Sequence, residues 1–317
     1  MIRYGILSTA QVVPRFVAGV KESEDGIVTA IASRGIEKAQ KMAQELAIPH
    51  AFGSYEELCQ SSEVDIVYVA VYNKGHYEAA KLALLNNKHV LLEKPFTMTL
   101  AQAEELFALA EERGLFLMEA QKALFLPITD QVQQAIEEDK IGAVRWLDSV
   151  TAYPNIDHIS WFRDLSAGGG VFRGAGTYPL EYMQHLLLAA PEDYKGTLTF
   201  PEGQSDAQAQ VTLRFPNGVI GTIFLTVDLD LPKRMIIYGE KGRIIIPDFW
   251  KTDTAEIQYG TGLTETLHSE QASEFVFEVN HVNECLQQGR LESPIVTKAL
   301  TLKTVAITES IYKNDEK

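Results

Sequence analysis

The apolar residues of the first 120 positions form short runs separated by longer amphipathic stretches. The runs have the length and the nearly continuous apolar character of strands that are buried on both faces. They lie at 2–7, 27–32, 64–71, 89–92 and 115–119. The stretches between them repeat apolar residues at helical spacing, at 11–20, 37–46, 77–86 and 100–113. This alternation predicts an α/β fold whose N-terminal part, 1–120, is a dinucleotide-binding Rossmann domain with a parallel sheet.

The pattern changes after about residue 120, where strands follow one another. They are predicted at 144–153, 208–215, 219–227, 234–238 and 243–246. The turns between them, such as 216–218 and 239–242, are typical of hairpins. We therefore expect residues 121–296 to form an α+β domain on an open, mainly antiparallel sheet, and a C-terminal helix at about 297–312 to pack back on the first domain. The strict alternation at 208–215 leaves one sheet face free for solvent or for a second subunit, which predicts a homodimer or a higher homo-oligomer.

Net charge and residue composition limit the kinds of molecule that the protein is expected to bind. The net charge of the 317 residues is −15, which opposes binding to nucleic acid and to anionic membranes. The chain has two cysteines and no His, Cys, Asp or Glu spacing that is typical of a metal site. We expect neither a signal peptide nor a membrane span, because the first apolar run is too short and no other run is long enough to cross a membrane. We expect a cytoplasmic protein without a metal that binds a small-molecule substrate.

The first strand-to-helix turn is a candidate phosphate-binding loop. Gly5 to Ala10 fits G-x-x-x-x-A, with Leu7 in place of the middle glycine of the dinucleotide fingerprint. Because a strand precedes the turn and a helix follows it, free N–H groups would face the cofactor pyrophosphate. Gly5, Ser8, Thr9 and Ala10 are therefore predicted to bind the cofactor; the alternative is an ordinary strand-to-helix turn.

Ser33 and Arg34 end the second predicted strand, where NAD-binding proteins usually carry a carboxylate for the ribose 2′-hydroxyl. A carboxylate would repel a 2′-phosphate, whereas an arginine can pair with it and stack on the adenine. This favours NADP over NAD; the alternative is a solvated surface arginine.

Glu93 and Lys94 follow the fourth predicted strand, at the sheet edge where open α/β sheets bind ligands. Beside an oxidised nicotinamide, which is cationic, the ammonium form of Lys94 would be disfavoured, so Lys94 could exchange a proton with a substrate hydroxyl. A structural Glu93–Lys94 surface pair is the alternative. His76 could border the same pocket or be a solvated loop histidine.

A second cluster combines Gly168-Gly169-Gly170 with Tyr178, at the start of an apolar helix predicted at 178–189. The glycines permit close backbone approach and positive φ. A helix N-terminus and a nearby lysine would both lower the pKa of Tyr178, which makes it a candidate acid/base. The alternative is a tyrosine packed in a domain interface with a satisfied hydroxyl.

These motifs resemble the Gfo/Idh/MocA, or glucose-fructose oxidoreductase, family over nearly the whole chain, and most of all its dimeric dihydrodiol and D-xylose dehydrogenase branch, which uses NADP. The resemblance rests on Gly5 to Ala10, the turn 73–76, Glu93-Lys94-Pro95, and the glycine run followed by 176–179. It implies that Lys94 is the catalytic lysine, that Tyr178 binds the reacting hydroxyl and that Lys94-Pro95 is a cis peptide. It also implies cofactor contacts from Tyr72, Asn73, His76 and Glu93.

Two positions depart from the family pattern. Gly174 stands where the family often has an aspartate, and Leu124 stands where it usually has an arginine. One polar substrate contact is therefore missing, which Lys122 or Arg173 could replace. Trp161 and Arg163, in the loop before the glycines, could also line the substrate cleft.

The sequence thus predicts an NADP-dependent dehydrogenase or reductase that acts on a hydroxyl or carbonyl carbon of a sugar, polyol or cyclic diol. Two alternatives stay open at this point. One is a non-catalytic, dinucleotide-sensing regulator on the same fold, which the loss of the aspartate at Gly174 would suit. The other is a reductase of a cyclic imine or enone.

Overall fold

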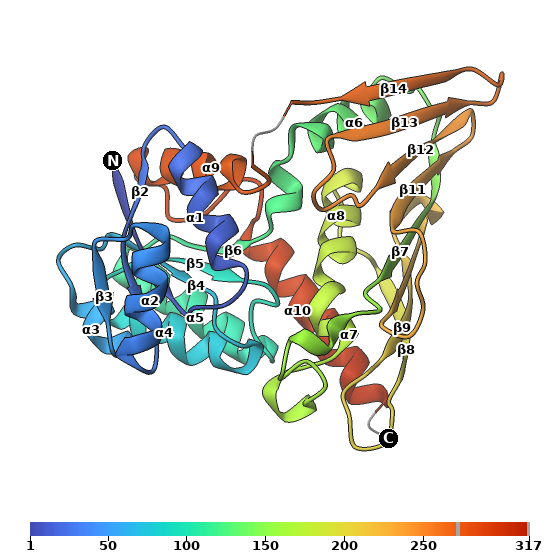
Figure 1. Cartoon of the computed structure of the whole chain (residues 1–317). Coiled ribbons are helices and arrows are strands. Elements are labelled where there is room, and N and C mark those ends of the chain that lie inside the picture. The colour runs from blue at the N-terminus through green and yellow to red at the C-terminus, as the bar shows by residue number, and fades with distance from the viewer. Residues whose placement is uncertain (271–272, 316–317) are drawn as a thin grey trace. The chain divides into compact units, whose positions relative to one another are not determined.

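A computed structural model of the chain describes residues 1–270 and 273–315. The chain divides into two compact units (Figure 1). The N-terminal unit comprises Met1–Lys122 and Ala272–Val305, and the C-terminal unit comprises Ala123–Gln271 and Ala306–Lys317. Residues 273–296, which belong to the predicted C-terminal domain 121–296, fall instead in the N-terminal unit. The physical reason is helix α9 (Val276–Gln287), which packs on α1 (Val13–Glu22) of that unit.

The N-terminal unit is built on a six-stranded sheet in which every strand pair is parallel. Its strand order is β3-β2-β1-β4-β5-β6. The strands are β1 (Ile2–Leu7), β2 (Gly26–Ala32), β3 (His50–Phe52), β4 (Ile66–Val69), β5 (His89–Glu93) and β6 (Leu117–Ala120). The chain leaves β1 in one direction and returns on its other side at β4, so the switch point lies between these two strands. This confirms the Rossmann arrangement, to which the structure adds β3.

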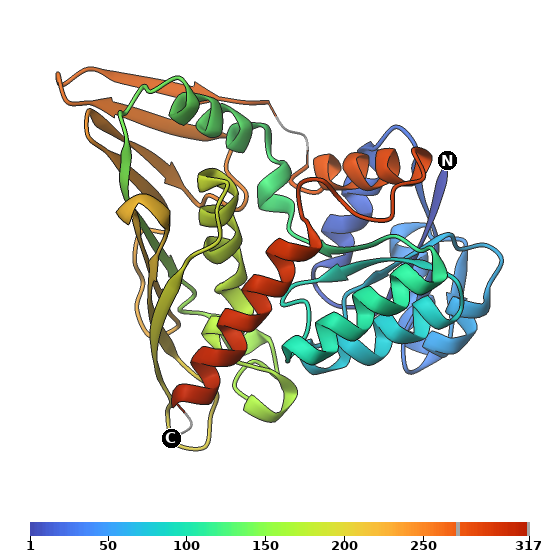
Figure 2. The same ribbon diagram turned by 180° about the vertical axis from the view of Figure 1, so that it is seen from behind.

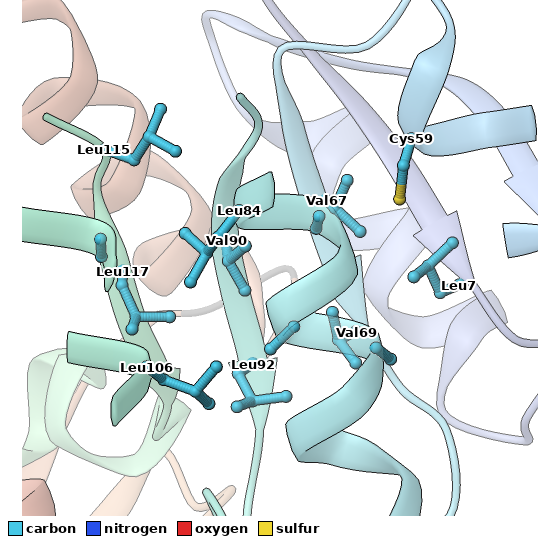
Figure 3. Packing of buried hydrophobic residues seen from close by; sticks show 14 of the residues in the cluster. Leu7, Cys59, Val67, Val69, Leu84, Val90, Leu92, Leu106, Leu115 and Leu117 are labelled. Atoms are coloured by element: carbon cyan, nitrogen blue, oxygen red, sulfur yellow. The ribbon is translucent and has the colours of Figure 1, made fainter. Parts of the chain in front are cut away.

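Helices cover both faces of this sheet. They are α1, α2 (Ile36–Leu46), α3 (Tyr55–Gln60), α4 (His76–Leu85), α5 (Leu100–Arg113) and α9. On one face, Val69 of β4 and Leu92 of β5 pack with Leu106 of α5 (Figure 3). On the other face, the ring of Tyr68 stacks on Phe16 of α1 with centroids 3.7 Å apart. Burial on both sides explains why the strands read as continuous apolar runs.

The C-terminal unit is built on an eight-stranded sheet of order β14-β13-β12-β11-β7-β10-β9-β8. Its strands are β7 (Val144–Ala152), β8 (Asp193–Thr199), β9 (Gln208–Arg214), β10 (Ile220–Thr226), β11 (Arg234–Gly239), β12 (Gly242–Pro247), β13 (Thr254–Tyr259) and β14 (Thr264–His268). All pairs are antiparallel except β7 with β10, which is parallel. The sheet is therefore mainly antiparallel, as predicted, with three strands that the sequence did not indicate.

The helices of the C-terminal unit lie along one face of its sheet (Figures 1 and 2). They are α6 (Pro127–Glu137), α7 (Val171–Ala175) and α8 (Thr177–Leu187). No helix in the part of the chain that the structure describes lies on the opposite face. This leaves the outward side chains of β7, β10 and β11 without a covering layer.

The last helix, α10 (Lys298–Asp315), belongs to both units. Leu302 and Val305 of its first half pack in the apolar cluster of the N-terminal unit. The second half, from Ala306, is assigned to the C-terminal unit. Among the described residues, no helix is long and apolar enough to cross a membrane.

Candidate active site

The turn after β1 has the geometry of a phosphate-binding loop. Ser8 adopts φ +123°, a conformation that favours glycine, and its Oγ accepts a hydrogen bond from the N–H of Ala10 at 3.0 Å. Helix α1 follows without a side-chain cap. Within the described residues, the backbone N–H groups of Thr9, Gln11 and Val12 have no acceptor. Unpaired N–H groups at the start of a helix suit an anionic group such as a pyrophosphate.

Gly5 is not part of this turn, contrary to the sequence-based expectation. It lies inside β1, and a Cβ atom built on it would come within 2.8 Å of Leu58 and Val64. Its lack of a side chain therefore serves the packing of β1 against α3 and the segment before β4. The residue with the special backbone conformation is Ser8, which glycine spacing alone could not reveal.

The end of β2 carries an exposed cation. Arg34 is exposed, and none of the carboxylates that the structure describes pairs with it. Ser33 is buried and its hydroxyl donates to the carbonyl of Gly35 at 2.6 Å. Burial raises the pKa of Tyr55, and the nearby positive charge of Arg34 opposes that rise. Tyr72 also lies near the ring of Tyr55. Sequence reasoning missed Tyr55, because a tyrosine at the start of a short helix carries no motif.

His76 is a buried residue that joins the loop after β4 to the loop after β5. Its Nδ1 lies 2.7 Å from the carbonyl oxygen of Pro95, and its Nε2 lies 3.0 Å from that of Val71. Burial lowers the pKa of His76, which favours the neutral ring, and a neutral ring can donate to only one of these carbonyls. The histidine is therefore not a solvated loop residue. Both ring nitrogens face backbone carbonyl oxygens, so His76 fixes the two loops relative to each other. Asn73, in the same loop, is also buried.

Glu93 and Lys94 lie at the carboxyl end of β5, which is separated from the switch point by β4 alone. The carboxylate of Glu93 accepts a hydrogen bond from the Tyr68 hydroxyl at 2.5 Å and one from the backbone N–H of Lys94 at 3.2 Å. The Lys94-Pro95 bond is cis, as the family resemblance implied. Burial lowers the pKa of Lys94, while the negative charges of Glu93 and Glu119 oppose that shift. The lowered pKa suits a lysine that accepts and returns a proton.

Lys122, expected to contact substrate, is held inside the N-terminal unit. Its Nζ lies 2.7 Å from Glu274, whose other carboxylate oxygen lies 2.5 Å from Arg15 of α1. The side chain of Lys122 is 5% exposed. Both cations also lie over the ring of Phe275. This arrangement gives Lys122 a structural partner that the sequence did not reveal, because Glu274 is 152 residues away.

Tyr178 lies in the first turn of α8, directly after the short helix α7. It is half-buried, and its ring lies 6.3 Å from that of Trp250 between centroids. Trp250 also packs against Tyr153, at 6.0 Å. The surroundings of Tyr178 within the C-terminal unit are therefore aromatic.

Two arginines that the sequence assigned to substrate are engaged with protein groups. Arg163 pairs with Asp157 at 2.6 Å and donates to Gln204 at 3.2 Å. The guanidinium of Arg173 lies over the ring of Tyr312 at 3.8 Å. Trp161, in the same loop as Arg163, is half-buried.

The two candidate acid/base residues belong to different units, Lys94 to the N-terminal unit and Tyr178 to the C-terminal unit. In the part of the chain that the structure describes, no group of three or more His, Cys, Asp or Glu side chains could hold a metal ion.

Comparison with protein-family models decides the classification. Residues 2–121 match the oxidoreductase family with the NAD-binding Rossmann fold, and residues 129–245 match the GFO/IDH/MocA C-terminal domain. The chain belongs to the Gfo/Idh/MocA oxidoreductase family. It is 30% identical to the trans-1,2-dihydrobenzene-1,2-diol dehydrogenase of Mus musculus, over 98% of this chain and 96% of that one. The enzyme of the same name from Xenopus laevis is also 30% identical, over 94% and 93%.

Solved structures show the same fold in this family. An aldose-aldose oxidoreductase from Caulobacter crescentus superimposes with a TM-score of 0.90 at 23% identity, over 99% of this chain and 97% of that one. A 3-ketoreductase from Actinomadura kijaniata, in complex with NADP, gives 0.89 at 24% identity over 98% and 97%. An oxidoreductase from Agrobacterium radiobacter in complex with NAD+ gives 0.85 at 16% identity over 99% and 96%. This Gfo/Idh/MocA protein is therefore an oxidoreductase with an NAD(P)-binding Rossmann domain.

Proposed function

We propose that this protein is an NADP-dependent dehydrogenase or reductase that transfers a hydride between the nicotinamide and a hydroxyl-bearing or carbonyl carbon of a sugar, polyol or cyclic diol. The observation that carries the proposal is the pairing of a phosphate-binding turn with a lysine of lowered pKa on one sheet edge. We set aside the alternative function of a non-catalytic, dinucleotide-sensing regulator, because the relatives that match over nearly the full chain are named as dehydrogenases.

The residues present fit the cofactor. The unpaired N–H groups after Ser8 would hold the pyrophosphate, with Thr9 and Ala10 in the same turn. Arg34, without a carboxylate partner among the described residues, would face a 2′-phosphate, and Tyr55 and Tyr72 would flank the adenosine. This arrangement favours NADP over NAD, because no carboxylate ends β2.

Nucleotide titration tests the cofactor assignment. Binding of NADPH and NADH would be followed by nicotinamide fluorescence for the wild type, for Arg34→Ala and for Lys41→Ala, which removes an exposed lysine of α2. We expect NADPH to bind more tightly, Arg34→Ala to erase the difference and Lys41→Ala to preserve it. Equal binding of both nucleotides to the wild type would contradict the assignment, and no binding of either would contradict the proposed function.

The proton chemistry is assigned to Lys94 and Tyr178. When bound, the cofactor accepts or supplies the hydride. Lys94 would take the proton of the substrate hydroxyl during oxidation, and the carboxylate of Glu93 would stabilise the ammonium that forms. Tyr178 would hydrogen-bond the reacting oxygen. We therefore expect the rate of oxidation to rise with pH, with a midpoint below the pKa of a free lysine.

The substrate class rests on the surroundings of Tyr178. Aromatic rings at Trp250 and Tyr153 suit the flat apolar faces of a cyclic diol or a pyranose. The named relatives act on dihydrobenzenediol, and a structural neighbour is named for aldoses. Because Arg163 and Arg173 are engaged with protein groups, we propose that the substrate carries no anionic group.

We infer that a second copy of this chain covers the open face of the C-terminal sheet. Trp146 of β7 is 38% exposed on that face and stacks on Tyr238 of β11 at 4.6 Å. Ile220 and Phe224 of β10 lie on the same face, in register with Trp146 and Val150. Light scattering should give the mass of a dimer for the wild type and that of a monomer for Trp146→Glu. A monomeric wild type at micromolar concentration would contradict the inference.

A further inference from the structure

A buried aspartate and a buried tyrosine tie the C-terminal helix to the start of α7. The carboxylate of Asp206 accepts the hydroxyl of Tyr312 at 2.6 Å through Oδ1 and the N–H of Phe172 at 2.8 Å through Oδ2. The hydroxyl oxygen of Tyr312 accepts the N–H of Arg173 at 3.3 Å. Asp206 is 1% exposed and Tyr312 is 2% exposed. Two successive N–H groups of α7 therefore depend on this pair.

The chain around Asp206 is built to let the carboxylate come this close. Gly170 adopts φ +121°, and a Cβ atom built there would lie 1.8 Å from Oδ1 of Asp206. The carbonyl of Asp206 also accepts the N–H of Val171, at 3.0 Å. The neighbouring Ser205 donates its hydroxyl to the carbonyl of Phe162 at 2.7 Å, which fixes the loop before the glycines. Ser205 and Asp206, which are adjacent in the chain, thus hold both the loop before the glycine run and helix α7 after it.

Hydrogen bonds continue from this cluster to Tyr178. The carbonyl of Phe172 accepts the N–H of Gly176 at 2.7 Å, and the carbonyl of Gly176 accepts the N–H of Leu180 at 3.2 Å. Tyr178 lies between these last two residues. Its backbone is therefore connected to Asp206 through two consecutive helical turns.

We propose that Asp206 and Tyr312 are positioning residues that set the place of the Tyr178 hydroxyl through α7. This proposal rests on the proposed function of Tyr178. The pair is suited to the role because both side chains are buried and each makes more than one hydrogen bond, so that neither can rotate without leaving a buried polar group unpaired. The ring of Tyr312 also supports the guanidinium of Arg173. None of these contacts involves a substrate or cofactor, so the effect on the reaction is indirect.

Tyr312→Phe tests the proposal with the smallest change. The substitution removes the hydroxyl and keeps the ring beneath Arg173. We expect amide hydrogen exchange of Phe172 and Arg173 to quicken and kcat to fall by about ten- to a hundredfold, because small misplacements of reacting groups cost that much. The affinity for NADPH should not change, because its proposed contacts lie in the other unit. The pH–rate profile should also shift, because the surroundings of Tyr178 change. Asp206→Asn, which keeps one acceptor oxygen, should have a smaller effect of the same kind.

Tyr182→Phe is the matched control. Tyr182 is fully buried in the same unit, and its hydroxyl lies 3.2 Å from that of Thr129, away from Asp206. This variant should lose comparable stability while its kcat, its pH profile and the exchange of α7 stay at wild-type values. Equal losses of kcat in Tyr182→Phe and Tyr312→Phe would overturn the positioning role.

Two variants separate the positioning role of Asp206 and Tyr312 from the proposed function of Tyr178. If Tyr178→Phe keeps full turnover, the proposed function of Tyr178 is wrong, and the positioning role for catalysis falls with it. If Tyr178→Phe is inactive but Tyr312→Phe matches the wild type in kcat, pH profile and α7 exchange, the proposed function stands and the positioning role is wrong.

Discussion

The surroundings of Lys94 and of Tyr178 differ in the interactions that build them. Burial lowers the pKa of Lys94, and the negative charges of Glu93 and Glu119 oppose that shift. The backbone around Tyr178 is held by hydrogen bonds to the carboxylate of Asp206 and to the carbonyl of Phe172, and the ring of Tyr178 packs among aromatic residues. The first arrangement controls proton affinity, and the second controls geometry. We therefore expect substitutions near Lys94 to act first on pH dependence, and substitutions near Tyr178 to act first on the rate and only secondarily on the pH profile.

Among the substitutions around Tyr178, loss of its own hydroxyl should have the largest effect on the reaction. Tyr178→Phe is expected to lower kcat by about 10²- to 10⁴-fold, the usual contribution of a positioned acid/base group. Binding of NADPH should be retained. Tyr259→Phe, which removes the hydroxyl that bonds Glu265 on the neighbouring strand, is the control and should keep its activity. Steady-state rates and fluorescence titration measure both quantities; equal activity of Tyr178→Phe and the wild type would remove Tyr178 from the account.

Gly170→Ala should cause a large loss of stability in the C-terminal unit. The new methyl group would overlap the carboxylate of Asp206, so a loss of about 3 kcal/mol or more is expected. Gly203→Ala is the matched control, because Gly203 has φ +69° and open space around it. That control should cost only about 1–2 kcal/mol for the left-handed backbone. Urea unfolding compares the two; similar losses would show that Asp206 yields easily and that α7 is held weakly.

A pH-dependent loss of stability is expected from Glu278, which is fully buried in the N-terminal unit. Burial raises its pKa well above the usual value, and the negative charges of Glu93 and Glu274 add to the rise while Lys122 opposes it. The folded state therefore binds the proton more tightly than the unfolded state. The stabilisation is complete below about pH 4.3, the pKa of an unfolded glutamate, and is lost as pH rises through the folded-state pKa.

Glu278→Gln should reduce this pH dependence, because glutamine does not ionise. Thermal unfolding from acidic to alkaline pH measures it. If the stability of Glu278→Gln depends on pH as strongly as that of the wild type, Glu278 does not titrate in the folded protein in this pH range. Glu112→Gln, at an exposed position of α5, controls for the loss of one carboxylate.

The smallest effect is expected at the phosphate-binding turn. Ser8→Gly removes the cost of φ +123° in a residue with a side chain and also removes the hydrogen bond from Ala10. These opposing changes should leave stability within about 1 kcal/mol of the wild type. NADPH affinity should be preserved, because the backbone N–H groups remain. A large loss of affinity would show that the hydroxyl itself binds the cofactor.

Sequence reasoning was most successful where a pattern is local. The strand 2–7, the helix 100–113 and the glycine that ends that helix follow from runs of apolar residues and one left-handed residue, Gly114. Strand β3 has only three residues, and α3 has six, so neither shows a period. Strand β8 was missed because its exposed and half-buried residues do not read as an apolar run.

The candidate site was predictable only in its motifs. Glu93-Lys94 at the end of a strand and Tyr178 at the start of a helix could be placed from the sequence. The partners that decide their surroundings could not, because they come from distant segments. Glu274 holds Lys122 across 152 residues, and Tyr312 holds Asp206 across 106. Such contacts depend on the tertiary fold and leave no local pattern.

The most direct test of the account is a turnover screen with NADP as the oxidant. Wild type and Lys94→Ala would be given a panel of aldoses, polyols and cyclic dihydrodiols, and the appearance of reduced nicotinamide would be followed together with NADP binding. The account predicts turnover of at least one cyclic substrate by the wild type and none by Lys94→Ala, although both bind NADP. Turnover by Lys94→Ala at the wild-type rate, or a wild type that binds NADP and oxidises no member of the panel, would contradict it.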